Sequence, residues 1–173
     1  MIKCTLPIFV MCCVIACNNN APTGVIESAI SQQTDEPNPF ILGNKKIVEL
    51  ENEEIELFLK RYKWKMTKTG TGLRYELTKK GTGNIFEIGE TVTLEYQTCS
   101  LSGEMIYNSK VDGLIRFAVD KSEAIAGLHE AAKLMNKGSE MRLIIPSHLA
   151  YGASGDGNKI KPYQTLVVKI KTV

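Results

Sequence analysis

Alternating apolar and polar residues predict β-strands over most of the chain beyond residue 63. The clearest case is ETVTLEYQT, where Val92, Leu94 and Tyr96 fall on one face and polar side chains fall on the other. Further strands are predicted at Trp64–Met66, Leu73–Leu77, LIRFAV, SEMRLIIP and QTLVVKIKTV. The glycines of TGTG, and Gly103 after Ser102, predict tight turns between neighbouring strands.

Two segments have helical spacing instead. Residues 44–63 place five apolar side chains on one face, with Asn44 as the expected N-cap: Ile47, Ile55, Phe58, Leu59 and Tyr62. A second, shorter helix is expected from Asp120, where Glu123 completes a capping box, to a stop at Gly138. Its apolar stripe comprises Ile125, Leu128, Ala132 and Met135, which leaves His129 on the surface side.

This order of elements predicts an α+β fold. The chain runs from a helix through a hairpin and further strands to one short helix and then more strands. Strands and long helices do not alternate, which argues against a parallel doubly wound sheet. The simplest arrangement is an antiparallel β-sheet wrapped around one short α-helix, preceded by the helix at residues 44–63.

The first residues are typical of an export signal. Lys3 precedes an apolar run, from Leu6 to Ala16, that is too short to span a bilayer. The run ends in VIAC, which resembles a bacterial lipobox and implies cleavage after residue 16 and lipid attachment to Cys17; an ordinary signal peptide with a chance cysteine is the alternative. We therefore expect a lipoprotein signal peptide at 1–16 and a flexible, membrane-anchored tether at 17–43. Because Asn18 rather than an acid follows Cys17, the outer membrane, facing the periplasm, is favoured over the inner membrane.

Composition excludes several kinds of chemistry. Without Lys3 the chain keeps 20 Lys and Arg against 19 Asp and Glu, a net charge of +1 that gives no reason to expect nucleic acid binding. Cys99 is the sole cysteine beyond Cys17, so no disulfide framework is expected. His129 and His148 have no neighbouring ligand residues, and we predict no metal site. The stretch GASGDG lacks the ending of a phosphate-binding P-loop, and no cofactor is predicted.

Four motifs give the chain a specific resemblance. VTLEY, AIAGLHEAAKLMNKG, IIPSHLAYGASG and KPYQTLVVKI, in this order, resemble the FKBP-type peptidyl-prolyl cis–trans isomerases over residues 64–173. The resemblance implies a half-open antiparallel sheet curled around one short helix. The lipobox, tether and first helix further resemble the exported FKBP-type lipoproteins associated with gliding motility in Bacteroidetes-like bacteria.

The resemblance also implies a site. Eight residues match the positions that form the family's pocket: Tyr96, Tyr107, Asn108, Phe117, Ile125, Leu128, Tyr151 and Val168. Five more match positions that meet the substrate in the segment before the helix, the tyrosine wall and the flap loop: Glu123, Ala124, Ala150, Asp156 and Ile160. The implied activity is rotation about Xaa–Pro bonds of exported polypeptides in an apolar pocket, by desolvation and stabilisation of the twisted amide.

Three positions depart from the family's pattern. Asn108 stands where an aspartate is usual, Leu128 replaces a tryptophan and Val168 replaces a phenylalanine. These changes predict lower isomerase activity and weaker binding of the family's macrolide inhibitors. Two alternatives follow: a catalytically weak FKBP-fold chaperone, or a scaffold subunit of a cell-envelope complex that contacts an envelope protein through the helix Asn44–Lys63.

Overall fold

The computed structural model describes residues 39–173. The predicted signal peptide at 1–16, Cys17 and the tether up to residue 38 lie outside these residues. The described chain begins with helix α1 (Pro39–Tyr62), so the predicted helix starts five residues earlier than expected. Asn44 therefore lies inside the helix and is not its N-cap. Proline is favoured at the first position of a helix, because the N–H group that it lacks would have no hydrogen-bond partner within the helix.

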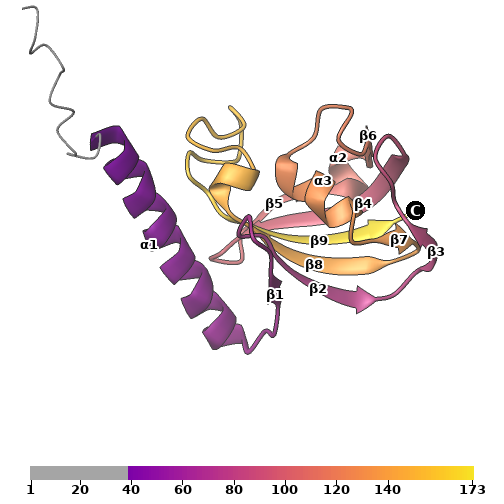
Figure 1. Cartoon of the computed structure of the whole chain (residues 1–173), viewed down its shortest axis with the longest axis horizontal. Helices are drawn as coiled ribbons and strands as arrows, with labels where there is room; N and C mark the ends of the chain where they lie inside the picture. The colour runs from indigo at the N-terminus through magenta and orange to yellow at the C-terminus, as the bar shows by residue number, and fades with distance from the viewer. Residues whose placement is uncertain (1–38) are drawn as a thin grey trace, which may run out of the picture. The chain divides into compact units, whose positions relative to one another are not determined.

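Nine strands follow α1, and seven of them form one antiparallel sheet (Figure 1). They are β1 (Thr67–Lys68), β2 (Arg74–Lys79), β3 (Thr82–Ile85), β4 (Thr91–Ser100), β5 (Met105–Asn108), β6 (Ile115–Ala118), β7 (Asn136–Lys137), β8 (Glu140–Ile145) and β9 (Leu166–Thr172). The order across the large sheet is β1-β2-β8-β9-β4-β5, β6 also pairs with β4, and β3 pairs with β7 apart from it. The predicted strand Trp64–Met66 is wrong in position: β1 begins at Thr67, and Trp64 and Met66 instead pack against the cluster of Ile55 and Phe58 of α1.

The inner face of the sheet holds the main core. Helix α3 (Ala126–Ala132) lies over this face (Figure 1) and packs Leu128 and Ala131 against strand residues such as Leu94 and Leu143. Period-two alternation explains the register: Leu143 pairs with Val168, and both side chains point inward. The predicted α+β architecture, an antiparallel sheet wrapped around a short helix, is therefore confirmed.

The short helix is shorter than its predicted span. Asp120 is not its cap: the residue has a φ of 53°, its N–H donates to Nδ1 of His129 at 3.0 Å, and its carboxylate pairs with Lys133 at 2.8 Å. His129 is not a simple surface residue either, since its ring packs edge-on against Phe117 with 4.9 Å between centroids. Gly138, with a φ of 79°, serves the turn before β8 and does not end the helix.

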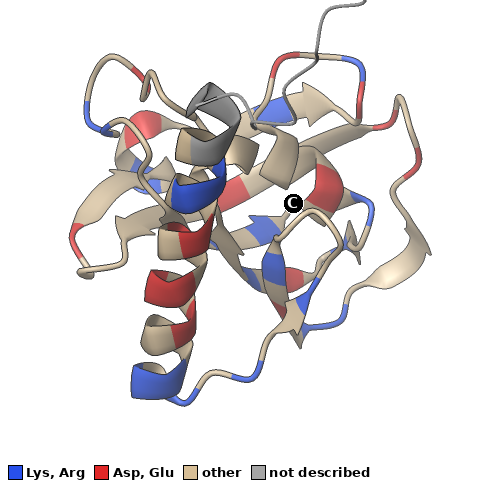
Figure 2. Ribbon diagram, turned by 60° about the vertical axis from the view of Figure 1, so that its left-hand side comes forward, with Lys and Arg blue, Asp and Glu red and all other residues tan. Residues whose placement is uncertain are grey.

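Helix α1 packs on the opposite, outer face of the sheet. Ile55 and Phe58 contact Ile144 and Val167, the outward-pointing neighbours of the core residues Leu143 and Val168. Acidic side chains follow the middle of α1 and basic ones gather at its C-terminal end, which suits the helix dipole (Figure 2). Among residues 39–173 no helix combines the length and the apolar character needed to cross a bilayer.

Candidate binding pocket

A cavity of about 260 Å³ opens between the inner face of the sheet, α3 and the loop before β9. Twelve residues line it: Tyr96, Thr98, Tyr107, Asp112, Ile115, Ile125, Leu128, Tyr151, Asp156, Ile160, Leu166 and Val168. Most of these side chains are aliphatic or aromatic, and the polar groups lie among them singly. Such a lining suits a compact apolar group flanked by a few hydrogen-bonding atoms.

Strands and helix each supply part of the floor. Tyr96 and Thr98 come from β4, and Leu166 and Val168 from β9, in both cases at the spacing of two that points side chains to one face. Leu128 reaches down from α3 and is buried. Leu128, Leu166 and Val168 belong to the main core and Tyr96 packs against it, so the pocket floor is part of that core.

Ile125 immediately precedes α3 and lines the pocket. Its carbonyl accepts from the N–H groups of Leu128 and His129 in the first turn of the helix. Within the part of the chain that the structure describes, its own N–H donates to no acceptor. Among residues 39–173 this N–H therefore has no acceptor, and it belongs to a residue that lines the cavity.

The loop between β8 and β9 closes the pocket from one side. Asp156 organises it: one carboxylate oxygen accepts from the N–H groups of Asn158 at 2.9 Å and Ile160 at 2.8 Å, and the other accepts from the Tyr107 hydroxyl. Lys159 lies over the Tyr107 ring, 4.8 Å from its centroid. Tyr107 on β5 thus ties the loop to the sheet edge, and Asp156 acts as a loop anchor as well as a wall residue.

The acid–base behaviour of the pocket favours hydrogen bonding over proton transfer. Burial, and then the charge of Asp112, raises the pKa of Tyr96, while burial followed by the charge of Asp156 raises the pKa of Tyr151. The hydrogen bond to Asp156, together with burial, raises the pKa of Tyr107. Burial would raise the pKa of Asp156, but the bonds from Tyr107, Asn158 and Ile160 outweigh it and hold that pKa below its ordinary value. At neutral pH the phenols are therefore protonated donors.

Eight of the thirteen residues expected at the site line this pocket: Tyr96, Tyr107, Ile125, Leu128, Tyr151, Asp156, Ile160 and Val168. Phe117 does not; its pairing with Val92 buries the ring in the core against His129. Ala150 is half-buried against the core beside Tyr151 and is absent from the lining.

The segment before α3 contributes only its last residue to the lining. Glu123 is exposed, and Ala124 packs against the core, so neither side chain reaches the cavity. The chain runs through a bend at this point, which directs successive side chains away from the pocket until Ile125.

Asn108 also lies outside the pocket. Its side chain caps the short helix α2 (Ser109–Asp112) by accepting the N–H of Lys110 at 3.0 Å, while its own N–H donates to Asp112 at 2.7 Å. The tight turn brings Asp112 into the pocket wall instead, so the cavity holds a carboxylate at this end despite the missing aspartate at 108. No periodic pattern pointed to Asp112, whereas Thr98 and Leu166 lie two residues from Tyr96 and Val168 and could have been found by the strand period.

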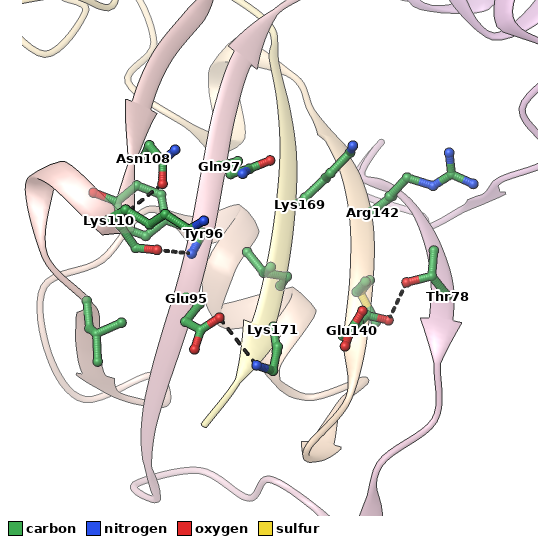
Figure 3. Close-up of a pocket in the computed structure, with 14 residues that line it drawn as sticks. Thr78, Glu95, Tyr96, Gln97, Asn108, Lys110, Glu140, Arg142, Lys169 and Lys171 are labelled. Carbon is green, nitrogen blue, oxygen red and sulfur yellow. Dashed lines mark hydrogen bonds and ion pairs between the residues drawn. The ribbon is translucent and has the colours of Figure 1, made fainter.

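A larger hollow, of about 610 Å³, lies on the outer face of the sheet and has a different character (Figure 3). Charged and polar side chains from five strands line it, among them the ion pair of Lys171 with Glu95 at 3.3 Å. Arg142 also lines it and pairs with Glu76, outside the lining, at 2.8 Å. Six of its fourteen lining residues are charged, against two of twelve in the pocket on the inner face. The candidate site is therefore the smaller pocket on the inner face.

Comparison with known proteins identifies a family. The family model described as FKBP-type peptidyl-prolyl cis-trans isomerase matches residues 83–173. The probable FKBP-type isomerase FkpA of Neisseria meningitidis is 35% identical over 124 residues, 70% of this chain and 45% of that protein. The outer membrane protein MIP of Legionella longbeachae is 35% identical over 104 residues, 60% of this chain and 44% of that protein.

Among solved structures, FkpA from Escherichia coli superposes with a TM-score of 0.63 at 29% identity, covering 78% of this chain and 62% of that one. The chain spans about half the length of the curated relatives it matches.

Proposed function

Because the chain belongs to the FKBP-type peptidyl-prolyl cis–trans isomerase family, we propose that it catalyses rotation about Xaa–Pro bonds in exported polypeptides. The observation that carries this proposal is the pocket on the inner face. Its apolar floor, formed by Tyr96, Leu128 and Val168, has the size and lining to receive a proline ring. Tyr151 and the Ile125 N–H supply donors at its edge.

The reaction needs no nucleophile. Amide resonance opposes rotation with a barrier of about 18–20 kcal/mol, which makes the uncatalysed reaction slow. Rotation removes the nitrogen lone pair from conjugation, so the substrate carbonyl carries less charge in the twisted form than in either planar form. A pocket that excludes water therefore destabilises the planar forms relative to the twisted one. Each 1.36 kcal/mol gained lowers the barrier enough for a tenfold rate increase.

Hydrogen bonds would orient the substrate for this rotation. Tyr151 is 39% exposed at the pocket edge, and its protonated hydroxyl can donate to a substrate carbonyl. The Ile125 N–H can donate to a second carbonyl along the same extended peptide. The substrate backbone is then held on both sides of the turning bond while the proline ring remains in the apolar floor.

The aliphatic residues at two floor positions determine how active we expect the isomerase to be. Leu128 and Val168 make the floor less aromatic than the family's pattern, which leaves less surface in contact with a proline ring. We therefore propose an isomerase of moderate activity and weak affinity for macrolide inhibitors. Asp112 keeps a carboxylate at the pocket, so we do not attribute the lower activity to Asn108.

A prolyl-peptide isomerisation assay tests the proposed activity. We expect a rate clearly above buffer, with catalytic efficiency falling about fivefold in Tyr151→Phe, since one hydrogen bond to the substrate is lost. Tyr163→Phe is the matched control, because Tyr163 lies in the same loop, is also exposed and does not line the pocket. A wild-type rate equal to buffer at high protein concentration would contradict the enzymatic proposal.

We further propose an envelope location through lipid on Cys17, facing the periplasm from the outer membrane. The lipobox-like VIAC supports this, and a matched relative is named an outer membrane protein. Expression in a Gram-negative host tests it: Cys17→Ser should release the protein from the membrane fraction and abolish incorporation of labelled palmitate. Cys13→Ser is the control and should leave both unchanged; membrane association of the Cys17→Ser protein without label would contradict a lipid anchor.

A further inference from the structure

A buried carboxylate lies between α1 and the body of the fold. Glu51 is only 8% exposed although it belongs to the run of acids along α1. Within residues 39–173 no Lys, Arg or His lies at ion-pair distance from it. Its charge is instead met by neutral hydrogen-bond donors, and nothing in the proposed chemistry uses it.

The donors come from both ends of one loop. The N–H of Ser147 donates to Oε1 at 2.6 Å and its hydroxyl to Oε2 at 3.0 Å, while the hydroxyl of Thr165 donates to Oε1 at 2.5 Å. Ser147 and Thr165 are themselves buried. One side chain of α1 therefore fastens the point where the chain leaves β8 and the point where it returns to β9.

The loop between these two points carries a wall of the pocket. The carbonyl of Ser147 accepts from the N–H groups of Ala150 at 2.9 Å and Gly152 at 2.8 Å, which flank Tyr151. At the other end, Thr165 directly precedes Leu166 in the pocket floor. In Figure 1 this loop rises beside the upper half of α1.

We infer that Glu51 is a positioning residue that holds the loop 147–165, and with it Tyr151, Asp156 and Ile160, in the arrangement that forms the pocket. This inference rests on the proposed function for its effect on catalysis. A buried carboxylate that loses its donors is strongly unfavourable, so the helix and the two loop ends keep one mutual arrangement. Helix α1 then serves the site through a polar contact on the far side of the loop from the substrate.

The test compares Glu51→Gln with Glu56→Gln in the full-length protein. A neutral glutamine replaces three charge-assisted hydrogen bonds by weaker ones, and it keeps the third only if the Ser147 hydroxyl turns to accept from its NH2 group, so we expect catalytic efficiency to fall about tenfold. Amide hydrogen exchange should rise in residues 150–163 but not in β4 or β9. Glu56→Gln removes the same charge from the next turn of α1, where the carboxylate contacts Arg74 and no loop residue, and should change neither readout.

The other possible outcomes of this comparison either support or contradict the role of Glu51. Unchanged rate and exchange in Glu51→Gln, or equal losses in both variants, would overturn it, since docking of α1 alone would then suffice. Should Glu51→Gln fail to fold, Thr165→Val removes a single donor, and faster exchange confined to residues 150–163 supports the inference while unchanged exchange refutes it. An inactive wild-type protein would overturn the proposed function only, because the exchange measurement still reports on the loop.

Discussion

Replacing Gly155 with alanine is expected to lower catalytic efficiency about 100-fold while the sheet stays folded. Gly155 has a φ of 66°, and a Cβ there would overlap the carbonyl oxygen of Ile160 and lie 3.0 Å from the carbonyl carbon of Lys161. Both are backbone atoms within the same loop and cannot turn aside. The loop must open, which separates Asp156 from Ile160 and moves the pocket wall.

The control for this substitution lies two residues away. Gly157 has a φ of 72° with open space around its missing side chain, so Gly157→Ala carries the backbone strain, about 1–2 kcal/mol, without the collision. Catalytic efficiency and thermal unfolding should be measured for both variants. Equal activity in the two would mean that the loop's conformation does not determine the rate, contrary to the proposed site.

The pocket floor was predictable because two independent signals coincide there. The period of two in β4 and β9 identified which face carries Tyr96 and Val168, and the resemblance gave those positions a role. Strand alternation is enforced by backbone geometry over many residues, so local irregularities do not displace it. The same holds for Leu128, whose helical spacing from Ala132 and Met135 directs it into the core.

Features that depend on short-range turns or on docking were not predictable in this way. Asn108 and Asp112 are separated by one turn of α2, and which of them faces the pocket depends on the exact path of that turn. Glu51 is one of several acids on α1, and its burial follows only from how the helix lies against the loop. Motif matching by position alone does not settle such cases: Phe117 on β6 lies outside the lining, whereas Tyr151 and Asp156 of the loop lie in it.

Val168→Thr is expected to lower catalytic efficiency about 30-fold with little change in shape. Val168 lines the pocket and is buried in β9, and threonine replaces one methyl group by a hydroxyl. A hydroxyl in the floor would keep water beside the bound prolyl amide, and that water would stabilise the planar form, whose carbonyl carries more partial charge, over the twisted form. A difference of about 2 kcal/mol, within the range for burying a polar group, corresponds to this loss of rate.

Val167→Thr is the control that distinguishes a loss of rate caused by a more polar pocket from one caused by lower stability of the fold. Val167 is the next residue on β9 but points to the outer face, against Ile55 and Phe58 of α1. The two substitutions bury the same hydroxyl in the same strand, so both should lower the free energy of unfolding by about 1–3 kcal/mol. Isomerisation rate and urea unfolding of both variants test the argument. If the mechanism is removal of water from the prolyl amide, the rate falls in Val168→Thr alone, whereas equal rates would remove desolvation as the source of catalysis.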